Sequence, residues 1–207
     1  MTLGYQFVSD LQQLASRIHN CFDCDLSQSR TKAVPGEGPK DADLMLIGEG
    51  PGFNEDQQSR PFVGAAGQYL DELLSTINLK RESVFITNMV KCRPPNNRDP
   101  FPGEIEACSK YIDEQIRLIQ PKVIVTLGRH SLGKFLPGET IGKVHGKPKQ
   151  IADFIVYPIY HPAAALRRRS LRLVIESDFQ LIPSLLSDGI EKKQADDQKS
   201  QQLSMFE

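Results

Sequence analysis

A short apolar run that ends in a glycine-rich loop constrains the fold of this chain more than any other stretch. The run covers residues 44–47 and is bounded by glycine, a pattern that predicts a buried strand. It breaks into Gly48-Glu49-Gly50-Pro51-Gly52, which continues neither a strand nor a long helix. Open α/β sheets bind their ligands at such carboxyl ends, so this loop is either a ligand-binding turn or an ordinary turn flanked by solvated acids.

Strand and helix patterns alternate along the rest of the chain. Besides 43–48, β-branched and aromatic runs predict strands at 84–88, 122–127 and 154–160. Apolar residues at helical spacing predict helices at 5–20, 65–77, 102–119 and 163–186, with a short helix at 129–136. Residues 140–149 are expected to form a loop or a hairpin. The alternation predicts an α/β fold: a three-layer α/β/α sandwich with a four-stranded parallel central sheet.

Composition limits the domain count and the range of partners. The chain has 207 residues, 39% of them hydrophobic, so we expect one domain over 1–187 with a sizeable core. Residues 188–207 are mostly polar and are expected to form a disordered tail. The net charge of −1 means that any contact with nucleic acid must come from a local patch. With no membrane-length apolar stretch and no signal peptide, we expect a cytoplasmic protein without membrane contact, and a monomer by default.

Four cysteines are spaced in a way that suggests a metal site. Cys21 and Cys24 form a CxxC pair, whereas Cys92 and Cys108 are separated by a longer interval. Because disulfides are rare in the cytoplasm, the thiols are candidates for metal binding. Four cysteines suit either a structural zinc ion or a [4Fe–4S] cluster, and the long second interval weakens the zinc interpretation. Four unrelated buried cysteines remain the alternative.

Polar and aromatic groups follow three of the predicted strands at their carboxyl ends. The glycine loop follows the first strand, Asn88 ends the second, and His161 follows the last. Carboxyl ends of parallel strands share one edge, so these groups should line one crevice. The planar amide of Asn88 matches the edge of a nucleobase, Phe62 offers a stacking face, and a histidine can stabilise a developing anion.

A cluster of arginines begins just beyond that crevice. Arg167, Arg168 and Arg169 follow three alanines at the entry to a predicted helix, together with Arg172. Guanidinium groups in such a place would contact DNA phosphates, and Leu166 or Arg167 could wedge into a base stack. A solvated helix face is the alternative for this cluster.

Several separate motifs together resemble the family 4 uracil-DNA glycosylases, the iron–sulfur members of the uracil-DNA glycosylase superfamily. The matching segments are Gly48–Gly52 with Glu55-Asp56, Arg60–Gly64, Thr87–Pro95 and His161–Ala164, and the four cysteines match in order and spacing. The resemblance runs from about residue 21 to about residue 186. It implies a [4Fe–4S] cluster on Cys21, Cys24, Cys92 and Cys108 with a largely structural role, and uracil-containing DNA, single- or double-stranded, as the substrate.

The resemblance also implies roles for single residues. Phe62 is similar to the residue that stacks on a flipped-out uracil, Asn88 to the reader of its Watson–Crick edge, and His161 to the donor that faces the carbonyl oxygen beside the breaking bond. Gly50 occupies the place of a water-activating aspartate in the best-known uracil glycosylases. Glu49 and Glu55 are therefore the candidates for positioning water.

Further implications concern specificity and the kind of reaction. Gly52 lies where other members carry a thymine-excluding tyrosine, so thymine must be rejected in another way. The stretch from Pro94 to Pro102 lacks the basic insertion of a uracil-trapping subgroup, which implies an ordinary turnover enzyme. We expect a monofunctional glycosylase that leaves an abasic site. A glycosylase of broader base choice, such as hypoxanthine or thymine, and a non-catalytic iron–sulfur or zinc nucleic-acid-binding module remain alternatives.

The C-terminal residues carry one more motif. Gln202-Leu203-Ser204-Met205-Phe206 resembles the short peptide by which bacterial repair and replication proteins bind the sliding clamp. Apolar anchors on a flexible tether suit binding in a groove. A chance ending on a polar tail is the alternative for this segment.

Overall fold

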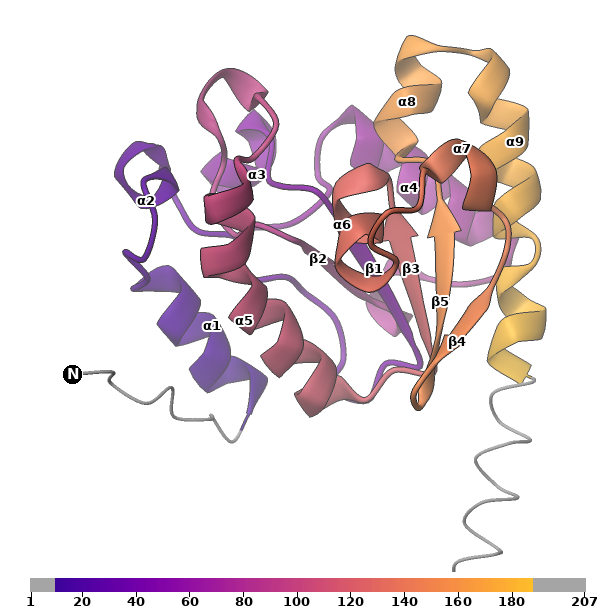
Figure 1. Ribbon diagram of the computed structural model, residues 1–207, viewed down its shortest axis with the longest axis horizontal. Helices are drawn as coiled ribbons and strands as arrows, with labels where there is room; N and C mark the ends of the chain where they lie inside the picture. The colour runs from indigo at the N-terminus through magenta and orange to yellow at the C-terminus, as the bar shows by residue number, and fades with distance from the viewer. Residues whose placement is uncertain (1–9, 188–207) are drawn as a thin grey trace, which may run out of the picture.

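A five-stranded sheet forms the centre of the protein, as seen in a computed structural model that describes residues 10–187 (Figure 1). The predicted tail and the Gln202–Phe206 peptide lie outside the described residues. The strand order is β2-β1-β3-β5-β4. The strands are β1 Leu44–Gly48, β2 Phe85–Asn88, β3 Val123–Leu127, β4 Lys149–Ile151 and β5 Phe154–Ile159.

The edge strand β4 corrects the expected sheet. Four strands run parallel as predicted, but β4 pairs antiparallel with β5, so the sheet has five strands and is mixed. The prediction missed β4 because it is three residues long and only partly buried, and therefore has no apolar run. A tight turn with Ala152 at φ 46° connects the two strands. The loop or hairpin expected over 140–149 is wrong over 141–144, which form helix α7, and only Lys149 belongs to the hairpin.

Helices surround the sheet. They are α1 Leu11–His19, α2 Leu26–Ser29, α3 Phe53–Gln58, α4 Ala65–Thr76, α5 Pro102–Ile119, α6 Arg129–Phe135, α7 Ile141–Val144, α8 Pro162–Arg167 and α9 Ser170–Phe179. Of these, α1, α4, α5 and α6 lie within predicted helices, whereas the short helices α2, α3 and α7 were not predicted. The single helix expected over 163–186 is wrong, because the chain breaks between α8 and α9. Arg168 has an extended backbone at φ −132° and ψ 97°, and neither Gly nor Pro marks this break in the sequence.

The sheet is covered by helices on both faces. Leu44 and Leu46 pack in one apolar cluster with residues of α4 and α9, whereas Met45 and Ile47 pack in another with residues of α5. Successive side chains of a strand point to opposite faces, so β1 lies between two helical layers. Figure 1 shows the same arrangement, with α1 and α5 on one side and α4, α8 and α9 on the other.

The carboxyl ends of the parallel strands meet at one edge, as the alternation predicted. Gly48 pairs with Asn88 in register, and the Gly128 N–H, just after β3, donates to the Ile159 carbonyl at 2.9 Å. The glycine loop, Asn88 and His161 therefore leave the sheet side by side. None of the helices in the described part of the chain combines the length and apolar character needed to cross a membrane.

Candidate active site

A pocket of about 520 Å³ lies at this edge of the sheet. Its walls come from the glycine loop, the end of β2, the loop over 94–99 and helix α8. All six residues predicted as catalytic or substrate-binding line it: Glu49, Gly50, Glu55, Phe62, Asn88 and His161. The volume falls in the range typical of small-ligand pockets. The three carboxyl ends that the sequence predicted to converge thus line one cavity.

Phe62 and His161 form one wall of the pocket. Their rings stack with centroids 5.5 Å apart and planes 24° from parallel. Phe62 has a left-handed backbone at φ 50°, and Arg81 Nη1 donates to its carbonyl at 3.0 Å. A Cβ on Gly67 would lie 1.8 Å from that carbonyl oxygen, so only glycine fits behind the turn. The aromatic ring is therefore held in a fixed position.

Asn88 presents a buried amide to the same pocket. Its side-chain Oδ1 is buried and has no hydrogen-bond partner, which is rare for a buried polar atom. Its backbone carbonyl accepts from Lys91 Nζ at 2.9 Å, which holds the end of β2 in place. A Cβ on Gly48 would lie 2.4 Å from Oδ1 and 2.6 Å from Phe62 Cζ, so the glycine makes room for both groups.

His161 is held as a neutral ring with a defined tautomer. The Ala163 N–H donates to His161 Nδ1 at 3.1 Å, so Nδ1 is an acceptor and the proton is on Nε2. Burial, reinforced by the positive charge of Arg167, lowers the pKa of His161 to about 4, although Glu55 opposes the shift. At neutral pH the ring therefore supplies an uncharged Nε2–H donor at the pocket wall.

Glu55 uses its carboxylate to hold the loops of the pocket. One oxygen accepts from the backbone N–H groups of Val63 and Gly64, both at 2.8 Å, and the other accepts from Gly52 N–H at 3.1 Å. These bonds join the glycine loop to the turn that carries Phe62. Glu55 lines the pocket as predicted, but its hydrogen bonds favour a positioning role over the activation of water.

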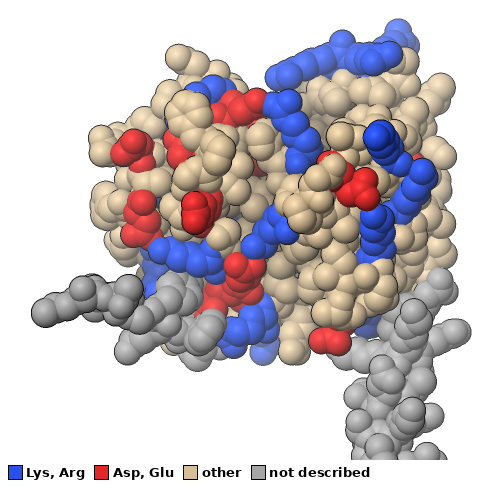
Figure 2. All heavy atoms as spheres, viewed as in Figure 1, with Lys and Arg blue, Asp and Glu red and all other residues tan. Residues whose placement is uncertain are grey.

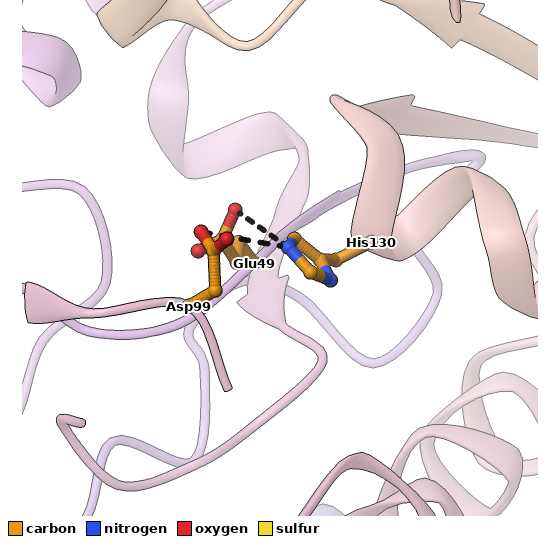
Figure 3. Close-up of side chains that lie close together, drawn as sticks. All are labelled: Glu49, Asp99 and His130. Atoms are coloured by element: carbon orange, nitrogen blue, oxygen red, sulfur yellow. Dashed lines mark ion pairs between the residues drawn. The ribbon is translucent and has the colours of Figure 1, made fainter. Parts of the chain in front are cut away.

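Glu49 has a different environment from Glu55. Figure 3 shows its carboxylate directed toward the ring of His130, with Asp99 beside it. His130 Nε2 lies 3.6 Å from Glu49 Oε2 and 3.7 Å from Asp99 Oδ1. Burial raises the pKa of Glu49, and the charge of His130 is the largest opposing influence. The pKa of Glu49 is therefore shifted toward neutral pH, as is common for proton acceptors in active sites.

Gly50 brings the backbone of the loop to the pocket. A Cβ at this position would lie 2.8 Å from Val90 Cγ2, so a larger residue would have to displace the side chain of Val90. The close approach fits a position where the main chain, rather than a side chain, contacts a ligand.

The predicted arginine cluster divides at the pocket. Arg167 and Arg168 line it, whereas Arg169 lies beyond it at the start of α9 and is exposed. Figure 2 shows Lys and Arg side chains along the upper edge of the molecule, where Figure 1 places α8. Leu166 is also exposed on this helix. Charge of one sign is thus concentrated locally, although the chain as a whole is nearly neutral.

The four cysteines come together on the side of the molecule where α1 and α5 lie. Cys92 and Cys108 belong to one apolar cluster, and Cys21 and Cys24 pack against it. Arg30 Nη1 lies 3.0 Å from Cys92 Sγ, and the Lys91 N–H donates to Cys108 Sγ at 3.3 Å. Among the described residues, no three of these thiols lie within 4.8 Å of one another. The set is therefore gathered, but more widely spaced than the ligands of a single ion.

Sequence reasoning missed His130 and Asp99 as parts of this site. His130 follows Gly128 at the carboxyl end of β3, so the rule that selected Asn88 and His161 also applied to it. Asp99 carried no such signal, because it belongs to a proline-rich loop that only the tertiary fold brings to Glu49.

Comparison with known proteins assigns the family. Residues 35–180 match the model of the uracil DNA glycosylase superfamily, so the chain belongs to that superfamily. It is 50% identical over 188 residues to a type-4 uracil-DNA glycosylase of Sulfurisphaera tokodaii, with 86% of each chain covered. A type-4 uracil-DNA glycosylase of Archaeoglobus fulgidus is 44% identical over 187 residues, covering 86% of this chain and 94% of that one. The chain is a member of the type-4 family, which confirms the predicted resemblance.

Proposed function

We propose that this chain is a DNA repair enzyme that hydrolyses the N-glycosidic bond of uracil in DNA and leaves an abasic site. The observation that carries the proposal is the unpaired, buried Oδ1 of Asn88, in a pocket shared with Phe62 and His161. An unsatisfied buried acceptor costs ~1–3 kcal/mol, which a bound ligand with an N–H donor would recover. The names of the type-4 relatives point to the same activity.

Asn88 would select uracil by its hydrogen-bonding edge. Its Oδ1 accepts from the N3–H of uracil, and its amide N–H donates to the adjacent carbonyl oxygen O4. Cytosine has an acceptor at N3 and an amino group at C4, so both contacts would oppose like with like. Sites built around such contacts discriminate by orders of magnitude, because a mismatched base leaves buried polar groups unpaired. Phe62 would supply the stacking face.

His161 would lower the barrier to bond cleavage. When the bond from C1′ to N1 breaks, its electron pair moves onto uracil, and negative charge develops on the carbonyl oxygen O2. The neutral Nε2–H of His161 is a fixed donor for that charge, whereas Nδ1 is already occupied by Ala163 N–H. Such a preorganised donor contributes on the order of 3 kcal/mol, or ~10²-fold in rate.

Glu49 would stabilise the sugar cation and accept a proton from the attacking water. Of the two candidate carboxylates in the pocket, Glu55 has three backbone donors, whereas Glu49 faces ionisable side chains. The described residues that line the pocket include no lysine. A covalent amine intermediate is therefore not expected, which favours a monofunctional glycosylase.

DNA would approach across α8. Arg167 and Arg168 line the pocket rim and suit phosphate contacts, and the exposed Leu166 suits insertion into the base stack. Extruding a nucleotide costs a few kcal/mol and least at a mismatch, so a U·G pair should be processed readily.

The cysteine cluster fits a [4Fe–4S] group held by Cys21, Cys24, Cys92 and Cys108. A zinc ion bound by four thiolates at ~2.3 Å would place the sulfur atoms within about 4 Å of one another, whereas no three of these thiols lie within 4.8 Å of one another. The donors at Cys92 and Cys108 suit thiolate ligands. When bound, the group would brace the segments that carry the cysteines, and its presence is testable from the visible absorbance of the purified protein.

A strand-break assay tests the proposed function. An end-labelled duplex with one U·G pair is incubated with the chain and then treated with hot alkali. We expect a break at the uracil position that requires alkali, and no break in a duplex with C·G at that position. Intact strands after incubation with a folded, brown protein would refute the enzyme and favour a non-catalytic binding module.

A further inference from the structure

Two exposed phenylalanines stand next to walls of the pocket that α8 does not supply. Phe53 is 56% exposed and begins α3, directly after Gly52 of the glycine loop. Phe101 is 59% exposed and lies two residues beyond Asp99, just before α5. Gly52 and Asp99 both line the pocket. Figure 1 shows α3 and the loop before α5 on one side of this edge of the sheet and α8 on the other. The proposed reaction uses neither ring.

An arginine lies over each of these rings. The guanidinium carbon of Arg93 is 5.2 Å from the centre of the Phe53 ring, and that of Arg98 is 3.8 Å from the centre of the Phe101 ring. Each phenylalanine nevertheless keeps more than half of its surface exposed. The exposed surface leaves room for a second flat group on each ring, in addition to the guanidinium.

Hydrogen bonds hold the two arginines in place. Arg98 donates to both carboxylate oxygens of Glu104, at 2.9 and 2.7 Å, and one of these oxygens also accepts from the Phe101 N–H at 2.7 Å. Arg93 Nε donates at 2.7 Å to Oδ1 of Asn97, which lines the pocket. The two pairs of arginine and phenylalanine are therefore ordered before a ligand arrives, which lowers the entropy cost of binding.

Unpaired nucleobases are the flat groups that the position of these rings favours. The pocket would take one flipped base, so the nucleotides on either side of that base must pass the pocket mouth. An unpaired base can stack on an aromatic ring, whereas a base inside a duplex already stacks on its neighbours. The guanidinium of Arg93 bonds the neutral amide of Asn97 and keeps its positive charge, which suits the phosphates of the same strand.

We propose that Phe53 and Phe101 form a stacking platform for the unpaired bases that flank the target uracil in single-stranded DNA. This inference rests on the proposed function, and it adds contacts to single strands that a duplex does not make. The arginine behind each ring adds a cation–π contact to the stack. Across the pocket, Arg167 and Arg168 would contact phosphates in either form of DNA.

Binding of labelled single strands, followed by fluorescence anisotropy, tests the platform without relying on catalysis. Each strand carries a tetrahydrofuran residue in place of the target nucleotide, so the chain has no base to excise. One strand has thymines on both sides of this residue. A second strand has further tetrahydrofuran residues there, which keep the phosphates but remove the bases. The wild type should bind the first strand ~10²-fold more tightly, because each stacked base contributes ~10-fold.

Leucine variants separate stacking from simple apolar contact. Phe53→Leu and Phe101→Leu keep an apolar side chain but remove the aromatic face. The double variant should bind both strands equally, with its loss confined to the strand that has flanking bases. Phe22→Leu is the matched control, since Phe22 is also exposed, lies 5.4 Å from the guanidinium of Arg30 and is outside the pocket lining. The control should bind as the wild type does. Tryptophan at positions 53 and 101 should retain the preference for bases.

The outcomes distinguish the platform from other roles of the two rings. A double leucine variant that keeps the wild-type preference for flanking bases would overturn the proposal. An equal loss on both strands would also overturn it, because that result indicates phosphate contacts or a structural change. Uracil excision by the wild type is measured in the same series. A wild type that prefers flanking bases through these rings but releases no uracil would refute the proposed function while supporting the platform.

Discussion

Replacing Gly48 with alanine should disrupt the pocket while leaving the fold largely intact. Gly48 ends β1, and its added Cβ would lie 2.4 Å from Asn88 Oδ1 and 2.6 Å from Phe62 Cζ. Ordinary contacts of this kind begin near 3.4 Å, so each of the two groups must move about 1 Å away from the added Cβ. Misplacement by ~1 Å costs on the order of 10²-fold in rate, and overpacking a core of this kind costs ~1–3 kcal/mol.

The assay for Gly48→Ala is single-turnover uracil excision together with a thermal unfolding curve. Gly133→Ala is the matched control, because a Cβ at that exposed position of α6 meets nothing within 4 Å. The control should keep full activity and gain up to ~1 kcal/mol of stability from helix propensity. Full activity of a folded Gly48→Ala variant would refute the reasoning, since catalysis would then not depend on the present positions of the Asn88 and Phe62 side chains.

Three further outcomes follow from the geometry of the site. Nitrogen NMR of His161 should report a neutral ring with its proton on Nε2 at pH 6, because the pKa of His161 is about 4, below the usual 6.5. The protein should therefore lose stability as the pH falls from 6.5 to 4, by about 3 kcal/mol at most, because the unfolded chain binds the proton more tightly. An imidazolium at pH 6 would contradict this. Asn88→Asp should lose uracil activity by ~10²-fold and gain cytosine excision, because a carboxyl group can present the opposite hydrogen-bonding pattern; a folded variant with no cytosine activity would contradict that role. Glu55→Gln should lower the unfolding temperature by several degrees, because the side chain loses one of the three hydrogen bonds that it accepts from backbone N–H groups. Glu49→Gln should leave the unfolding temperature nearly unchanged. Equal shifts would show that the two carboxylates do not differ in structural role.

Much of the site was predictable because topology alone brings its main groups together. A buried strand followed by glycine, Asn88 at the end of β2 and His161 after β5 are local signals, and the parallel sheet places all three at one edge. Phe62 was predicted as a stacking face from its aromatic side chain, and the resemblance to known motifs implied the same role. Its left-handed backbone depends on Gly67 and Arg81, which approach it from other segments.

The missed features depend on tertiary contacts or on weak local signals. Strand β4 is short and half-solvated, and its pairing with β5 alone makes it a strand. The break at Arg168 has no helix-breaking residue. The holding role of Glu55 requires the backbone N–H groups of Val63 and Gly64 to turn toward it, which cannot be read from the order of residues. Such roles are visible only once distant loops are placed.

The most direct test of the account is to count free uracil and abasic sites in one reaction. DNA with a single uracil is incubated with the purified chain, the released base is quantified by mass spectrometry, and the abasic sites are titrated with an aldehyde-reactive probe. The account predicts one uracil for each abasic site, and a loss of both on the order of 10²-fold when His161 is replaced by alanine. Abasic sites without free uracil, or full release without His161, would contradict it.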